Sequence, residues 1–214
     1  MKKMPLVLIM FILCIGLSGC IDIFQHITKD GSGIHRNTIK VTVSKTIFAM
    51  ANGFSGSGED IDYEKLFDES TPLDVKEYSP FNATVKTVND TMDIGYLVDM
   101  NIDYQDRNTV NKINRSNTSF IPKYNGKHII IPIACLGGDA DPSDDNAMTA
   151  AFLATGKYRL AISKKCITNI ERIMIKTAEG ETDSDFLDLY DEYLVEIPIP
   201  IIFMNDIDLI IYSK

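Results

Sequence analysis

Tryptophan is absent from the 214-residue sequence, and histidine occurs only at His26, His35 and His128. None of the three has the His-Glu-x-x-His spacing of a zinc hydrolase, and no cysteine stands at ligand spacing from a histidine. The stretch 53–58, GFSGSG, completes neither a Gly-x-Ser-x-Gly nucleophile elbow nor a phosphate-binding loop with its lysine. We therefore expect a protein that is not an enzyme and that binds no cofactor or zinc.

Basic residues are also scarce, with 21 lysines and arginines against 30 acids and a net charge of −9 at pH 7. Polyanions such as nucleic acid repel a chain with this balance. No segment after the N-terminus reaches the roughly 18 apolar residues that suggest a spanning helix. The sequence thus predicts no nucleic-acid partner, and only its first residues are suited to a membrane.

The N-terminus carries the one strongly apolar run. Residues 1–4 form a cationic head, 5–17 an apolar body, and Ser18 and Gly19 a small-residue exit. The body is shorter than the roughly 20 residues of a spanning helix, and the order of the three parts is typical of a secretory signal peptide. A buried N-terminal helix and a signal peptide cleaved at another bond remain as alternatives.

Residues Leu17-Ser18-Gly19-Cys20 resemble the lipobox of bacterial lipoproteins. The resemblance implies cleavage before Cys20, a thioether from its sulfur to diacylglycerol, and acylation of the new amine. Two or three acyl chains exceed what one chain achieves as a reversible anchor. We therefore expect a signal peptide at 1–19, and a single extracytoplasmic domain at 20–214. That domain would be anchored by lipid in the bacterial cell envelope, facing the periplasm or the cell surface.

The four cysteines fall into two groups on this interpretation. Cys14 leaves with the signal peptide and Cys20 carries the lipid, so Cys135 and Cys166 remain. In an oxidising compartment an even pair suggests one disulfide, worth roughly 3–4 kcal/mol in the chain-entropy model. Two separately buried thiols are the alternative.

Period-two alternation dominates the rest of the chain. It is clearest at 93–104, DIGYLVDMNIDY, where every second residue is apolar, the pattern of a sheet with one buried face. Pro198 and Pro200 place part of one strand at a sheet edge or in irregular structure. The ranges expected to form strands are 21–28, 34–44, 81–88, 93–104, 119–136 (a hairpin turning at Asn125-Gly126), 157–163, 169–177, 192–202 and 206–213.

Helices are few in this prediction. The ranges 45–52, 62–69 and 144–156 have helical patterns, and 105–119 forms a loop or a short helix. Because tight turns join most consecutive strands, the sequence predicts an α+β fold, with a predominantly antiparallel β-sheet and a few short helices.

An acidic cluster follows the second predicted hairpin, in GGDADPSDDN. Carboxylates are the ligands that Ca²⁺ prefers, but the EF-hand template lacks its glycine at position six and its glutamate at position twelve. Capping of the helix at 144–156 is the simpler role for the later acids. The candidate calcium ligands are Asp139, Asp141, Asp144 and Asp145.

A local basic cluster stands out on this acidic chain. Five cations fall within about twenty residues that contain one acid, Asp106. Such a cluster can bind headgroup phosphates or anionic glycans, or it can be a solvated loop. Its members are Arg107, Lys112, Arg115, Lys123 and Lys127.

Two ends of the chain resemble the LppM-like lipoproteins. The first comprises a strand, the turn KDGSG at 29–33 and the following strand and helix of 34–48, and the second lies within 158–212. The resemblance implies a noncatalytic, membrane-anchored domain whose curved sheet and helices shelter an amphiphile. It assigns no residue a role, and the middle of the chain departs from the family pattern.

The function expected from these features is noncatalytic binding of a lipid or glycolipid by a membrane-anchored lipoprotein. A surface-exposed protein-interaction or adhesin-type lipoprotein is the second hypothesis, and a hydrolase is the third. The expected partners are the membrane, through the N-terminal lipid, and an amphiphile. No protein partner follows from the sequence.

Overall fold

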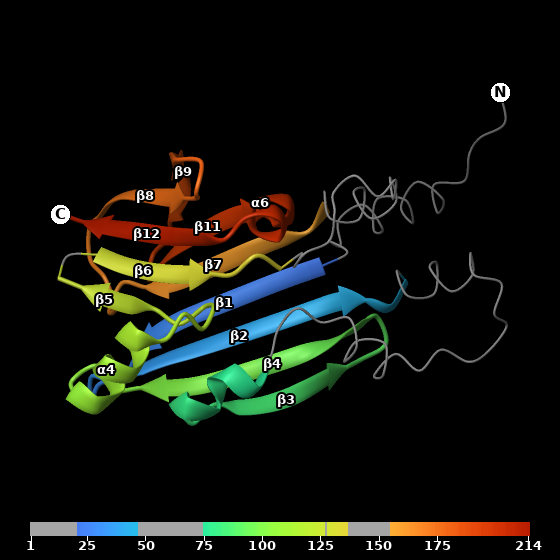
Figure 1. Cartoon of the computed structure of the whole chain (residues 1–214), viewed down its shortest axis with the longest axis horizontal. Helices are drawn as coiled ribbons and strands as arrows, with labels where there is room; N and C mark the ends of the chain where they lie inside the picture. The colour runs from blue at the N-terminus through green and yellow to red at the C-terminus, as the bar shows by residue number, and fades with distance from the viewer. Residues whose placement is uncertain (1–20, 47–74, 127, 137–154) are drawn as a thin grey trace, which may run out of the picture.

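The computed structural model describes residues 21–46, 75–126, 128–136 and 155–214, which form two sheets with short helices (Figure 1). In spatial order, sheet A contains β10 (Phe186–Asp188), β11 (Glu192–Pro198), β7 (Lys157–Ser163), β1 (Ile21–Lys29), β2 (His35–Ser44), β4 (Asp93–Ile102) and β3 (Thr84–Asn89). Sheet B contains β5 (Lys123–Asn125), β6 (His128–Ile133), β12 (Ile207–Ser213), β8 (Ile170–Lys176) and β9 (Glu181–Ser184). The predicted fold class, α+β with mostly antiparallel sheet, is confirmed.

One strand pair within the described residues departs from the antiparallel pattern. β1 pairs in parallel with β7, from Asp22 opposite Lys157 to Ile27 opposite Ile162. On its other side β1 pairs antiparallel with β2 through the hairpin expected from the sequence. The N-terminal strand therefore lies at the centre of sheet A.

The core lies between the two sheets and is built by alternation along each strand. Ile23 and Ile27 of β1 and Leu209 and Ile211 of β12 are 0–1% exposed and belong to one apolar cluster. The partners of these residues on neighbouring strands follow the same two-residue period. In the described part of the chain, the apolar faces of the two sheets thus pack against each other.

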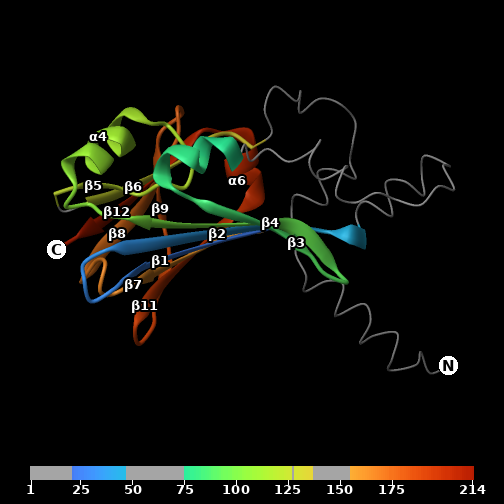
Figure 2. The same ribbon diagram turned by 90° about the horizontal axis from the view of Figure 1, so that it is seen from below.

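Short helices lie at both ends of the strands (Figures 1 and 2). α4 (Arg107–Arg115) follows the end of β4, and α6 (Ile199–Met204) follows the end of β11. A 3-10 helix, η1 (Val75–Phe81), precedes β3.

Two predicted segments take a more definite form in the structure. The strand expected over 192–202 ends at Pro198, because Pro200 sits in the first turn of α6, where a missing N–H costs nothing. The segment 105–119, left open between loop and helix, contains α4. The helix predicted over 62–69 and nearly all of those over 45–52 and 144–156 lie outside the described residues.

None of the helices in the described ranges is long and apolar enough to cross a membrane.

Candidate functional site

The helix α4 owes its position to a cap and an apolar stripe. The Asp106 carboxylate accepts hydrogen bonds from the backbone N–H groups of Asn108 and Thr109, at 3.2 and 3.0 Å. These bonds satisfy donors that the first turn of a helix leaves open. Ile113 is buried on the inner side of the helix, so the cations of α4 are left on its outer side.

Four of the five predicted basic residues lie in this region. Arg107, Lys112 and Arg115 are exposed on α4, and Lys123 is half-buried in β5. The ion pairs found in the described ranges join other side chains. We call Arg107, Lys112 and Arg115 the α4 surface. Lys127 lies outside the described residues.

A cavity of about 120 Å³ lies between α4 and the neighbouring β5. It has room for about four water molecules and is smaller than the roughly 300–1,000 Å³ typical of ligand pockets. A space of this size admits a small group and excludes an acyl chain. Its lining residues are Tyr104, Val110, Ile113, Asn114 and Tyr124.

Three rings pack beside this cavity. The ring centroids of Tyr104 and Tyr124 are 4.4 Å apart, and His35 lies 4.9 and 5.0 Å from them. The Tyr104 hydroxyl donates to the Pro122 carbonyl at 2.6 Å. Such tilted and edge-on contacts add to the energy of burial. This cluster could not be predicted from the sequence, because its members are separated by up to 89 positions.

Burial sets the charge state of the cluster. It lowers the pKa of His35 to about 4, with a smaller effect of the nearby Lys29 in the same direction. Burial also raises the pKa of both tyrosines far above their usual value. The Nδ1 atom of His35 is buried and has no hydrogen-bond partner in the described part of the chain. At neutral pH these rings are uncharged.

The disulfide expected between Cys135 and Cys166 is not formed in the structure. Cys135 Sγ lies 3.0 Å from the Phe203 carbonyl oxygen at the end of α6. Cys166 Sγ lies 3.7 Å from the Ile27 carbonyl oxygen near the end of β1, and burial raises its pKa to about 11. The prediction failed because the two thiols follow strands that bring them to different parts of the fold.

The other predicted site residues fall outside the described ranges. These are the lipidation site Cys20 and the calcium candidates Asp139, Asp141, Asp144 and Asp145. Within the described ranges no group of three or more His, Cys, Asp or Glu side chains could hold a metal ion.

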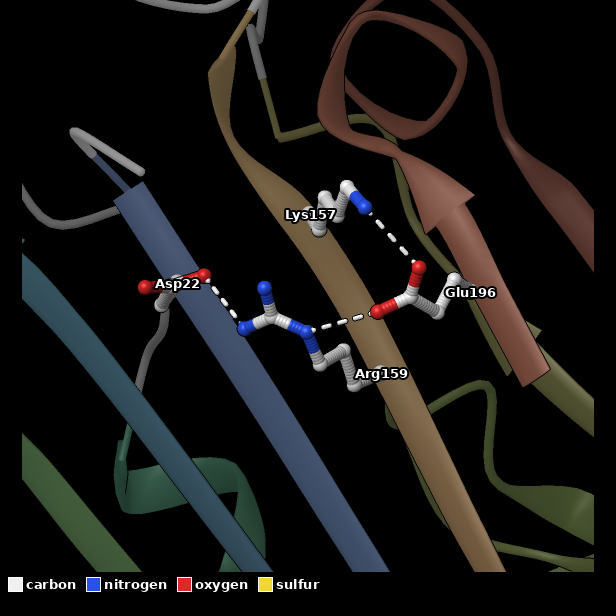
Figure 3. Close-up of polar contacts among 4 residues, drawn as sticks. All are labelled: Asp22, Lys157, Arg159 and Glu196. Carbon is white, nitrogen blue, oxygen red and sulfur yellow. Dashed lines mark hydrogen bonds and ion pairs between the residues drawn. The ribbon is translucent and has the colours of Figure 1, made fainter. Parts of the chain in front are cut away.

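A second polar cluster lies at the opposite end of β1 (Figure 3). Arg159 donates from Nη1 to Asp22 and from Nε to Glu196, both at 2.9 Å. Lys157 binds the other oxygen of Glu196, also at 2.9 Å. The cluster ties β1, β7 and β11 together across the parallel strand pair. Its side chains are about one-third or more exposed, as expected of a surface network rather than a catalytic site.

A third polar cluster is buried between the sheets. Gln25 donates to Asn37 at 2.8 Å and to the Phe120 carbonyl at 2.7 Å, and Asn37 donates to the same carbonyl at 2.9 Å. Tyr158 donates to Gln25 at 2.6 Å. All these side chains are 0–1% exposed. The cluster is structural, and its sequence signal was a pair of polar residues at inward positions of β1 and β2.

The fold places this chain in the class of two-sheet, largely antiparallel α+β domains. Scans of protein-family models and of curated proteins find no match. Among solved structures, the chain is similar to the folded domain of Mycobacterium tuberculosis LppM, determined by NMR. The TM-score is 0.43 at 9% identity, over 91% of each chain. The resemblance predicted from the sequence thus reappears in the structural comparison, and it transfers no residue role to this chain.

Proposed function

We propose that the chain is a noncatalytic, lipid-anchored envelope protein whose α4 surface binds the anionic headgroup of an amphiphile. The observation that carries the proposal is the α4 surface itself: three exposed cations with no ion-pair partner among the described residues, on a chain of net charge −9. Each lysine or arginine near an anionic bilayer contributes about 1 kcal/mol to binding.

Headgroup recognition suits the described structure better than enclosure of an acyl chain. Most apolar side chains of the two sheets pack against each other in the core, where Ile27 and Leu209 are fully buried. The cavity beneath α4, at about 120 Å³, fits part of a headgroup.

The noncatalytic part of the proposal is supported by the charge states beside α4. Burial lowers the pKa of His35 to about 4, which makes it a weak base, and raises the pKa of Cys166 to about 11, which leaves its thiol protonated near neutral pH. Neither group therefore has the pKa of an effective general base or thiolate nucleophile.

Vesicle flotation tests the proposal. The mature chain carrying Cys20→Ser should float with phosphatidylcholine vesicles that contain phosphatidylglycerol, and not with phosphatidylcholine alone. Reversal of the α4 surface, Arg107→Glu with Lys112→Glu and Arg115→Glu, should weaken binding roughly 100-fold or more, since three charges of about 1 kcal/mol each are lost.

A charge-matched variant controls for the change in net charge. Lys86, Lys176 and Lys214 are exposed elsewhere on the described surface, and their reversal to glutamate should leave most of the binding intact. Equal loss in both triple variants, or no flotation of the parent protein, would overturn headgroup binding at α4.

A protein-interaction role is the second candidate, favoured by one observation. The β10–β11 hairpin exposes Leu187, Leu189 and Tyr190, with the tyrosine 94% exposed. Tyrosine is enriched at the energetic centres of protein interfaces. Capture of a cell-surface protein by the parent chain, lost in Tyr190→Ala and retained in the α4 reversal, would support this role.

A further inference from the structure

The proposed anchor would join sheet A without a linker. Cys20 directly precedes Ile21, and Ile21 is the first residue of β1. A flexible linker would let a domain sample many orientations above its membrane. Here the lipidated residue would be the neighbour of a central sheet strand.

The first residues of β1 are held firmly. Ile21 packs against the core, Ile23 is 1% exposed, and Asp22 is paired with Arg159 in the cluster of Figure 3. Gly156 packs so closely that a Cβ there would lie 2.7 Å from the Ile21 carbonyl oxygen. The start of β1, which the lipidated residue would directly precede, is therefore fixed to the sheet.

The α4 surface lies at the other end of the strands. β1 runs nine residues from Ile21 to Lys29, which at about 3.3 Å per residue corresponds to roughly 30 Å. β2 begins at that far end with His35, which pairs with Ile102 at the end of β4, and α4 follows β4 (Figures 1 and 2).

We propose that the anchored domain binds anionic lipid in trans: the α4 surface contacts the headgroups of a second bilayer, not those of the bilayer that holds Cys20. The inference rests on the proposed function, both for the anchor and for headgroup binding. It adds the source of the ligand, which is argued from the direct connection of Cys20 to β1 and from the length of β1.

The charge of the chain acts in the same direction. Without Lys2 and Lys3 of the signal peptide, the net charge of −9 becomes −11, so the body of the domain is repelled by an anionic bilayer, whereas the α4 surface is attracted. An anionic host bilayer therefore disfavours an arrangement in which sheet A lies flat on it. With β1 upright on that bilayer, the α4 surface would stand about 30 Å from it, beyond three Debye lengths at physiological salt, so attraction to its own membrane would be screened.

Vesicle bridging tests the inference with the lipidated, mature protein. Protein reconstituted in phosphatidylcholine vesicles should cluster a second population that contains phosphatidylglycerol, measured by light scattering and by energy transfer between lipid dyes. Bridging should persist when the host vesicles also contain phosphatidylglycerol, and the α4 reversal should abolish it.

A linker variant gives the matched control. Insertion of a long Gly/Ser segment between Cys20 and Ile21 lets the α4 surface reach its own bilayer. Bridging by this variant should fall when phosphatidylglycerol is added to the host vesicles, while bridging by the parent protein should not.

The outcomes separate the two proposals. If the Cys20→Ser protein fails to bind phosphatidylglycerol vesicles, headgroup binding itself is wrong. If that protein binds but the lipidated protein does not bridge, or bridges only with the inserted linker, binding in trans is wrong. Capture of heparin without capture of either vesicle type would also overturn it, in favour of an anionic glycan.

Discussion

At the scale of single residues, the side-chain amides of Gln25 and Asn37 both donate a hydrogen bond to the carbonyl oxygen of Phe120. Phe120 has a positive φ of 62°, a conformation in which few non-glycine residues are found. Its backbone N–H also donates to the Pro132 carbonyl at 2.8 Å, so the segment between α4 and β5 is fastened to both sheets. Buried polar groups are expensive when one partner is lost.

Gln25→Leu should therefore destabilise the domain by about 2–5 kcal/mol, because it orphans the Asn37 side-chain oxygen and the Tyr158 hydroxyl. Urea unfolding followed by circular dichroism measures the change. Lys40→Leu, on the outward face of β2, is the control and should change stability by less than about 1 kcal/mol. A loss of similar size in both variants would contradict the role of the buried cluster.

His35 makes stability depend on pH. Its pKa in the folded protein is about 4, below the value of about 6.5 expected when unfolded, so the folded state resists protonation. The stability it contributes is complete above pH 6.5 and is lost as pH falls toward 4, by about 3 kcal/mol. In urea titrations from pH 7 to 4, His35→Phe should lose less stability than the parent by about this amount. If the free energies of unfolding of the two proteins fell in parallel from pH 7 to 4, the assigned role of His35 would be wrong.

At the scale of elements, alternation located most strands, because a half-buried sheet imposes a period of two on the sequence. Three short elements, η1, β9 and β10, were not predicted, because their sequences lack this alternation of apolar and polar residues. The pairing of β1 with β7 could not be predicted either, because the local sequence pattern of a strand does not identify a pairing partner more than a hundred residues away. The cations of α4 were predicted as a cluster, but the rings beneath them meet only through the fold.

The cap of α4 gives a prediction at this scale. Asp106→Ala and Asp106→Asn remove the same charge, but only alanine removes the side-chain acceptor at the helix start. Relative to Asp106→Asn, the Asp106→Ala variant should lose about 1 kcal/mol of stability and bind vesicles more weakly. The reason is that the first turn of α4 frays, so its three cations are no longer held on one helix surface. Equal unfolding midpoints and equal flotation of the two variants would argue against a role for the cap.

At the scale of the whole molecule, the two ends of sheet A differ in chemistry. One end carries the Arg159 cluster, which ties the start of β1 to its neighbours, and the other carries the α4 surface above three uncharged rings. The proposed anchor and the proposed ligand site thus lie at opposite ends of one strand. The opposite placement of the two sites could not be predicted from the sequence. It follows from the pairing of β1 with β2 and of β2 with β4, which sets the position of α4 relative to the start of β1.

The parallel pairing of β1 and β7 also bears on when the chain can fold. A strand synthesised first must wait for a partner at Lys157–Ser163, and β7 in turn pairs with β11 near the C-terminus. Contacts of such long sequence separation form slowly. A chain ending at residue 156 should therefore remain sensitive to protease, as pulse proteolysis beside the full chain can measure; resistance of the truncated chain would disprove this. During synthesis the chain would therefore stay unfolded until nearly all of it has left the ribosome, because β7 and β11 are made long after β1.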